Sequence, residues 1–188
     1  MMRERERCEQ ALTLAASGHT VSLVSSGDAG VYGMAGLAIE LREKLGVVSP
    51  IEIIPGMTAS TAASAAMGAP LMLDFAVISL SDLLVPWDMI RKRLSAVAQA
   101  DLVVALYNPK SKKRVTQLEE AAQIFRSLRS DSTPVGIATA VGSPEQSIVL
   151  TDLKHFLDFE INMRSVVIIG NSTSRIVDSF FITPRGYL

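Results

Sequence analysis

Asp28 lies in a glycine-rich turn, residues 25–36, that follows a short apolar run at residues 21–24. Glycine permits positive φ and lets backbone amides approach a ligand closely. Ligands of open α/β sheets bind beyond the carboxyl ends of strands, where a carboxylate suits a cationic or hydroxyl-rich ligand. Two structural interpretations compete with this one: Asp28 caps the following helix, or the glycines only form a tight turn. The glycine spacing matches neither phosphate-loop pattern.

Further turns of this kind end other predicted strands, at residues 54–59, 106–109 and 170–172. The first two also have a structural interpretation. Thr58 can cap the alanine-rich helix that follows it, and Asn108 precedes a proline, as in many turns. Their recurrence in both halves of the chain favours a cleft between two sheets over a set of unrelated turns.

These turns have to be positioned by alternating helices and strands. We expect helices over residues 3–17, 31–45, 58–67, 88–99, 114–128 and 152–158. We expect strands over residues 21–24, 47–54, 75–80, 102–107, 134–140, 146–150, 165–170 and 178–183. Strands separated by helices predict an α/β fold with a mostly parallel sheet. The proline-containing segment 81–87 predicts a linker between two α/β domains, residues 1–83 and 84–188.

The composition excludes several classes of protein. The chain has 188 residues, a net charge of −1, two histidines and one cysteine, Cys8. One cysteine rules out a disulfide framework, and these few ligands predict no metal site. No basic run extends beyond residues 110–114, and no apolar run reaches membrane-spanning length, so we expect no nucleic acid and no membrane partner. The charged first residues contain no apolar signal segment, which predicts a cytoplasmic protein.

Seven segments together resemble the tetrapyrrole methylases, over essentially the whole chain. They are SSGDAGVYGMAG (25–36), PGMTAS (55–60), MGAPL (67–71), DFAVISLSDLLVPW (74–87), LYNPKSKKR (106–114), IIGNS (168–172) and TPRGY (183–187). Within that family, the SLSDLL, LYNP and TPRGY segments are most similar to the members that methylate C-17 of precorrin-3B.

The resemblance implies a kidney-shaped fold of two α/β domains that bind S-adenosylmethionine in the cleft between them, often as a homodimer. Alanine stands at position 29, where the superfamily usually has proline. The positions that match the family's cofactor contacts are Gly27, Asp28, Ala29, Thr58, Ala59, Tyr107, Asn108, Gly136, Ala138 and Gly170.

The implied reaction is methylation at C-17 of precorrin-3B or cobalt-precorrin-3, coupled to ring contraction, in cobalamin biosynthesis. Contraction requires proton movement, for which Asp28, Tyr32 and Asp82 are the candidates. The tetrapyrrole carries carboxylates that basic side chains can bind. The candidates for that contact are Lys110, Lys112, Lys113, Arg114 and Arg185. The alternatives are another methylase of the same superfamily and a non-catalytic binding module.

The start of the sequence departs from the family pattern. Family members usually begin with a strand and a Gly-x-Gly-Pro-Gly loop beneath the substrate, whereas this sequence opens on a predicted helix. We therefore expect the N-terminal domain to lack its first strand. A sheet edge left without its neighbour exposes unpaired backbone groups, which a dimer would cover.

Overall fold

The computed structural model describes residues 3–112 and 114–187 and separates the chain into two compact units, Met1–Thr58 and Ala59–Leu188. The sequence predicted a boundary between residues 83 and 84 instead. The difference arises because strand β2 (Phe75–Ser79) hydrogen-bonds to β3 (Val103–Tyr107) in one sheet, which keeps segment 81–87 inside the larger unit.

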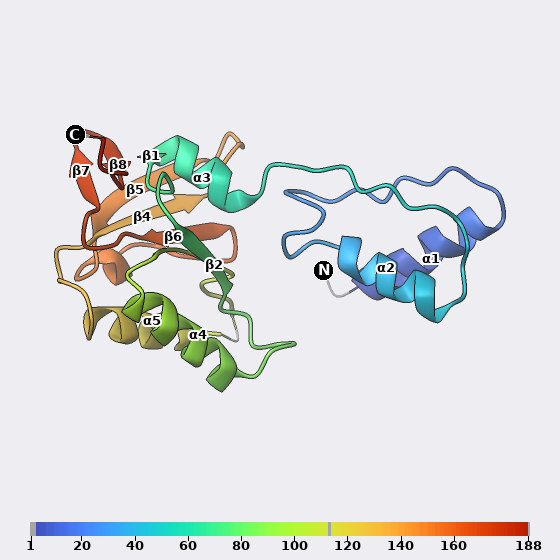
Figure 1. Cartoon of the computed structure of the whole chain (residues 1–188), viewed down its shortest axis with the longest axis horizontal. Helices are drawn as coiled ribbons and strands as arrows, with labels where there is room; N and C mark the ends of the chain where they lie inside the picture. Colours follow the sequence, from blue (N-terminus) through green and yellow to red (C-terminus); the bar gives the residue numbers. More distant parts are fainter. Residues whose placement is uncertain (1–2, 113, 188) are drawn as a thin grey trace. The chain divides into compact units, whose positions relative to one another are not determined.

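The first unit is built on two helices, α1 (Glu4–Ala16) and α2 (Ala35–Lys44), labelled in Figure 1. Their facing sides enclose a small core that consists of Cys8, Leu12, Met34, Ala38 and Leu41. Cys8 is therefore a core residue, and burial raises the pKa of its thiol. Residues 31–34, expected to be helical, belong to the turn before α2.

The two strands expected in this unit, residues 21–24 and 47–54, are not formed. Neither segment has a strand assignment, and Val24, Val48, Ile53 and Ile54 are exposed. Apolar composition favours an extended chain, but a strand exists only where a neighbour supplies backbone N–H and C=O groups in register. Among the described residues of this unit, no such pairing occurs.

The second unit contains a five-stranded sheet with the order β2-β3-β6-β4-β5, where β4 is Pro134–Thr139, β5 is Ser147–Asp152 and β6 is Ser165–Ile169. Among the described strands of this sheet, only β2 and β3 form a parallel pair, since β6 is antiparallel to both of its neighbours and β5 is antiparallel to β4. The predicted mostly parallel sheet is wrong because β4 reaches β5 through a short loop, and no long helix lies between β5 and β6.

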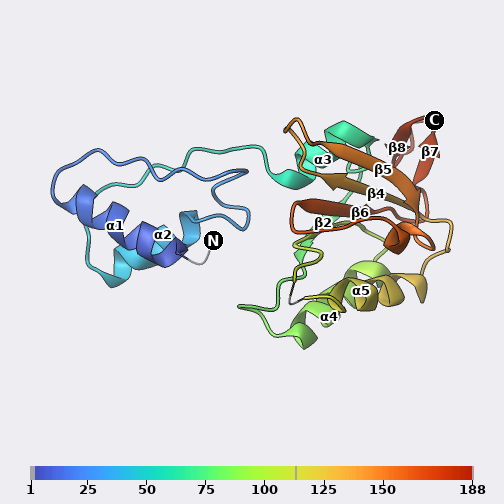
Figure 2. The same cartoon turned by 180° about the vertical axis from the view of Figure 1, so that it is seen from behind.

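Both faces of this sheet are covered, as Figures 1 and 2 show. Helices α4 (Trp87–Gln99) and α5 (Gln117–Arg126) pack on one face, together with the 3-10 helix η1 (Phe156–Asp158). The other face meets α3 (Ala59–Met67) and a small sheet, whose strands are β1 (Gly68–Ala69), β7 (Arg175–Val177) and β8 (Phe180–Ile182). Alternate strand residues enter opposite cores: Val104 and Leu106 face α4 and α5, whereas Val103 and Ala105 face α3.

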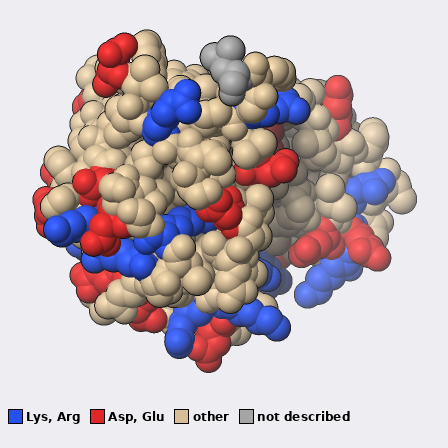
Figure 3. Space-filling model, turned by 60° about the vertical axis from the view of Figure 1, so that its left-hand side comes forward, with Lys and Arg blue, Asp and Glu red and all other residues tan. Residues whose placement is uncertain are grey.

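Charged side chains of both signs are interspersed on the face seen in Figure 3, so charge there is balanced over short distances.

Among the helices of residues 3–112 and 114–187, none combines the length and the apolar character that crossing a membrane requires.

Candidate functional site

The Asp28 carboxylate joins two loops of the first unit. Its Oδ1 accepts hydrogen bonds from the amides of Gly30 (2.8 Å) and Val31 (3.0 Å), inside the glycine-rich turn. Its Oδ2 accepts a hydrogen bond of 2.9 Å from the amide of Gly56, which lies far along the chain. The side chain therefore fixes both the shape of its own turn and the position of the Pro55-Gly56 loop.

The backbone of Gly56 lies directly against the same turn. A Cβ atom at position 56 would lie 2.1 Å from the carbonyl oxygen of Gly27, a separation that real Cβ atoms do not adopt. Gly27 itself has φ +75°, a conformation that glycine adopts without strain. The sequence predicted Gly27 and Asp28 but missed Gly56, although a Pro-Gly pair at the end of an apolar run was a visible signal.

The three proton-transfer candidates have different surroundings. Hydrogen bonds from Gly56 first, and then from Gly30 and Val31, lower the pKa of Asp28, so this carboxyl is held as an anion. Tyr32 is exposed and has the unusual φ of +54°. Asp82, in the second unit, is exposed and its Oδ2 accepts a hydrogen bond of 2.9 Å from Gln117 Nε2.

In the second unit, Tyr107 ends strand β3 and joins it to helix α3. Its hydroxyl accepts a hydrogen bond of 2.6 Å from the amide of Ser60, one residue after Ala59 begins that helix. Its carbonyl accepts a hydrogen bond of 2.9 Å from the amide of Leu80, just beyond β2. Tyr107 thus positions α3 and the carboxyl ends of both parallel strands, while Thr58 is the last residue of the first unit.

Asn108 begins the loop after β3 in a left-handed conformation, φ +51°, which asparagine adopts more readily than most residues. Its Nδ2 donates a hydrogen bond of 2.9 Å to Ser79 Oγ at the end of β2. Because β2 and β3 are parallel, Ser79, Tyr107 and Asn108 all lie at one edge of the sheet. The sequence missed Ser79, which marks the end of an apolar strand.

The predicted charge partners of the substrate fall into two groups. Lys110, Lys112 and Arg185 are exposed, whereas Arg114 is 8% exposed. Lys113 lies outside the residues that the structure describes.

Two predicted adenosine-side positions lie within the core. Gly136 and Ala138 belong to β4 and are buried on the face that meets α3. A Cβ at position 136 would lie 2.4 Å from Met67 Sδ, so the glycine allows helix and strand to pack closely. A direct role of these two residues in cofactor binding stays a prediction.

Gly170 follows β6, and both its backbone amide and its carbonyl form hydrogen bonds within the second unit. Its amide donates a hydrogen bond of 2.9 Å to the Pro134 carbonyl, and its own carbonyl accepts one from Arg129. Because β6 is antiparallel to β3, with Ile169 opposite Val104, Gly170 lies at the opposite edge of the sheet from Asn108. The structure therefore does not bring these two predicted positions together.

The Arg129 side chain, only 3% exposed, ties this opposite edge together. Besides Gly170, its guanidinium donates to the carbonyls of Leu102 (2.7 Å) and Val97 (3.3 Å), and it lies 4.7 Å from the centre of the Phe125 ring. Burial lowers the pKa of Arg129, and the Asp101 carboxylate 3.9 Å from Nε opposes that shift.

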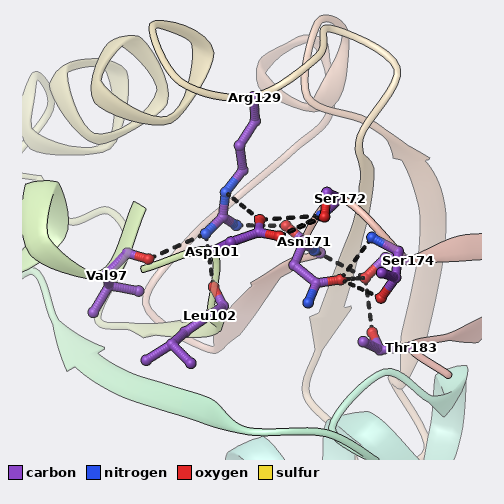
Figure 4. A network of polar contacts seen from close by, with 10 residues as sticks. Val97, Asp101, Leu102, Arg129, Asn171, Ser172, Ser174 and Thr183 are labelled. Atoms are coloured by element: carbon purple, nitrogen blue, oxygen red, sulfur yellow. Dashed lines mark hydrogen bonds and ion pairs between the residues drawn. The ribbon is translucent and has the colours of Figure 1, made fainter. Parts of the chain in front are cut away.

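The loop after Gly170 is held by side chains drawn in Figure 4. Asn171 Oδ1 accepts hydrogen bonds from Thr173 and from Ser174 Oγ, which also contacts Thr183 at 2.7 Å. Asp101 accepts hydrogen bonds from the amide and the hydroxyl of Ser172. The polar residues of this loop thus bond to one another, which supports a structural role for the loop.

Two groups of residues remain with the chemistry to bind a nucleoside and an amino acid. In the first unit, small residues on the exposed glycine-rich turn leave backbone groups accessible around Asp28. In the second, Tyr107 and Asn108 supply a phenol and an amide at one sheet edge. Each group by itself offers hydrogen-bonding groups that suit the hydroxyl, amine and carboxylate groups of S-adenosylmethionine.

Comparison with known proteins gives consistent matches. The model of the family "Tetrapyrrole (Corrin/Porphyrin) Methylases" matches residues 2–157. A probable cobalt-factor III C(17)-methyltransferase of Salmonella typhimurium is 50% identical over 188 residues, which cover 100% of this chain and 78% of that protein. A precorrin-3B C(17)-methyltransferase of Sinorhizobium sp is 42% identical over 98% of this chain and 76% of its own length. The crystal structure of the methyltransferase CobJ aligns with TM-score 0.89 and 40% identity, over 96% of this chain and 77% of that one.

Proposed function

Because this chain belongs to the tetrapyrrole methylases, we propose that it transfers a methyl group from S-adenosylmethionine to C-17 of precorrin-3B or of its cobalt-containing counterpart. The transfer is coupled to contraction of the macrocycle, as the resemblance implies. The proposal places the protein in cobalamin biosynthesis.

One observation carries the proposal: the similarity to C(17)-methyltransferases extends over the whole chain. The 50% identity to the Salmonella protein spans all 188 residues, and the CobJ structure superimposes over 96% of them. A shared fold alone would support many activities, whereas an alignment with 50% identity over the full chain also spans the turns that carry the proposed site residues.

In the proposed mechanism, the protein binds and aligns the reactants. When bound, S-adenosylmethionine supplies a methyl carbon on a positively charged sulfur, so the protein's main task is orientation and exclusion of water. Gly27, Asp28 and Ala29 in the first unit would hold the cofactor together with Thr58. Ala59, Tyr107 and Asn108 would hold it in the second unit, and Gly136, Ala138 and Gly170 are the remaining proposed contacts.

The proposed acid–base roles follow from the surroundings of each group. Asp28 is held as an anion by three backbone amides, so its part is to shape the turn rather than to carry a proton. The proton movement that contraction requires then falls to Tyr32 or Asp82, both of which are exposed. The variants Tyr32→Phe and Asp82→Asn test this role, because loss of the proton-transferring group would impair ring contraction more than methyl transfer.

The experiment is a methyl-transfer assay with S-adenosylmethionine labelled in the methyl group. Precorrin-3B and its cobalt form are supplied in parallel. The products are then separated, and their masses are measured by mass spectrometry. We expect one added methyl group, and the preferred substrate identifies the cobalamin route. A folded chain that binds S-adenosylhomocysteine but transfers no methyl group to either substrate would instead support the alternative of a binding module.

We also propose that the protein is a cytoplasmic homodimer. Support comes from the resemblance to a family whose members are often dimeric, together with exposed apolar side chains such as Val48 and Ile54. Light scattering on the purified protein, over a range of concentrations, gives the oligomeric state directly.

A further inference from the structure

Two arginines of the second unit are buried, and their surroundings differ sharply. Arg129 donates to three carbonyls, stacks on Phe125 and lies near the carboxylate of Asp101. These groups compensate most of a guanidinium that serves structure alone, although Nε of Arg129 is buried and has no hydrogen-bond partner among the described residues. Arg114 is also buried, at 8% exposure, but its guanidinium donates to only one carbonyl, and no aromatic ring or carboxylate within the described residues lies against it.

The contacts of Arg114 use two of its three guanidinium nitrogens. Nε donates a hydrogen bond of 3.0 Å to the carbonyl of Asn108, and Nη2 lies 3.4 Å from the sulfur of Met163. A thioether is a weak acceptor. Within residues 3–112 and 114–187, Nη1 has no hydrogen-bond partner. This nitrogen is not fully enclosed by the protein. One edge of the guanidinium is therefore open to a ligand.

The charge of Arg114 has no counter-ion in the described part of the chain, where no Asp or Glu lies within ion-pair distance of it. Burying a cation without a partner is costly, and a carboxylate that binds in the bidentate manner offsets this cost best. The guanidinium is also bonded to Asn108, at the sheet edge formed by β2 and β3.

We infer that Arg114 binds a carboxylate of one of the two reactants. This inference rests on the proposed methyl transfer, which supplies two sources of carboxylate: the methionine portion of S-adenosylmethionine and the side chains of the tetrapyrrole. Burial and the absence of a counter-ion set Arg114 apart from the exposed Lys110, Lys112 and Arg185. Planar guanidinium geometry makes lysine a poor replacement at such a site.

The test compares the wild-type protein with Arg114→Met, Arg114→Lys and a matched control, Lys92→Met. Lys92 is exposed on α4, so this control removes one positive charge without touching the proposed site. Calorimetry measures Kd for S-adenosylhomocysteine and for its decarboxylated analogue S-adenosyl-3-thiopropylamine, which keeps the amine and lacks the carboxylate. The methyl-transfer assay gives KM for precorrin-3B with each variant.

A cofactor contact predicts that Arg114→Met weakens S-adenosylhomocysteine binding about tenfold to a hundredfold and leaves the affinity for the decarboxylated analogue unchanged. A tetrapyrrole contact predicts the same factor in KM for precorrin-3B, with unchanged Kd for both cofactor analogues. In either case Arg114→Lys recovers part of the loss, and Lys92→Met behaves as the wild type.

Equal weakening of S-adenosylhomocysteine and its decarboxylated analogue would overturn the inference, because it would show that Arg114 only supports the Asn108 loop. Unchanged Kd and KM would overturn it as well. If Arg114→Met does not fold, the same comparison of the two analogues is made with Arg114→Lys. A wild-type protein that binds S-adenosylhomocysteine no better than the decarboxylated analogue excludes the cofactor arm, whereas failure to bind either analogue or to transfer methyl refutes the proposed function itself.

Discussion

The two units support their candidate binding loops by different means. In the first unit, the glycine-rich turn and the Pro55-Gly56 loop are held by the half-buried Asp28 carboxylate and a close backbone contact, beside a core of five buried residues. In the second, Tyr107 and Asn108 extend directly from a strand that is buried on both faces. One set of loops therefore depends on a few hydrogen bonds and a backbone contact, and the other depends on the core.

The largest expected effect tests the core of the second unit. Replacing Phe125 by alanine removes a fully buried ring and the stacking partner of Arg129, so we expect the free energy of unfolding to fall by about 3–5 kcal/mol. Chemical denaturation measures this change. Hydrogen exchange then shows whether amide protection at Gly56 in the first unit is unaffected, and a parallel loss there would break the contrast between the units.

The next effect tests the close backbone contact of the first unit. In Gly56→Ala, the new Cβ would meet the Gly27 carbonyl at 2.1 Å, so the two loops have to separate. We expect binding of S-adenosylhomocysteine to weaken about tenfold to a hundredfold, which corresponds to a few kcal/mol of strain. Calorimetry is the measurement, and wild-type affinity in this variant would show that the contact is irrelevant to binding.

A third variant isolates the hydroxyl of Tyr107. Tyr107→Phe removes the acceptor of the Ser60 amide, and Ser60 is 1% exposed, so water cannot readily replace that bond. An unsatisfied buried amide costs about 1–3 kcal/mol, which denaturation of the variant would reveal. Unchanged stability would mean that the start of α3 is held by other contacts.

The fourth prediction concerns pH and the Asp28 carboxylate. Because its pKa is lowered in the folded protein, mainly by the Gly56 amide, the stability it contributes is present above the unfolded value of about 3.9 and is lost as the pH falls through the lowered folded value. We expect the Gly56 amide protection factor to stay constant from pH 5 to 8 (roughly the plateau that this shift predicts) and to fall in stronger acid. Asp28→Asn, whose amide replaces the Oδ2 acceptor, should lack this protection at every pH. Protection that persists in the variant would contradict the assignment.

The smallest expected effect is a gain in stability. Gly36 lies inside α2, and a Cβ there would meet nothing within 4 Å. Gly36→Ala should therefore stabilise the protein by about 0.5–1 kcal/mol, since alanine loses less conformational freedom in a helix. It also serves as the control for Gly56→Ala, because the same chemical change is made at an unobstructed position. A loss of stability would show that the surroundings of α2 are tighter than the structure indicates.

Much of the second unit was predictable because its signals are local. The apolar runs at residues 75–80, 102–107 and 165–170 became β2, β3 and β6, and the periodic segments 88–99 and 114–128 became α4 and α5. Strand direction was not predictable from such runs. The antiparallel β6 therefore placed Gly170 at the edge opposite Asn108, although both follow a strand in the sequence.

The failures in the first unit have another physical origin. Residues 21–24 and 47–54 have the composition of strands, but pairing depends on a partner that composition does not reveal. Asp28 was identified by its place in the turn, whereas its bond to Gly56 joins distant parts of the chain. The burial of Arg114 was not predictable either, because a run of basic residues is ordinarily exposed and the contact with Met163 joins distant parts of the chain.

The strand order has a consequence for how the protein emerges from the ribosome. The second neighbour of β3 in the sheet is β6, which pairs Val104 with Ile169. Among the described strands, β1 likewise pairs only with β8, in which Phe181 lies opposite Gly68. Pairings between such distant segments form slowly, because a long loop has to close before they contribute stability. While the chain is being synthesised, β3 consequently has β2 on one side and an open edge on the other. The last quarter of the chain is therefore what protects the nascent sheet from pairing with other molecules.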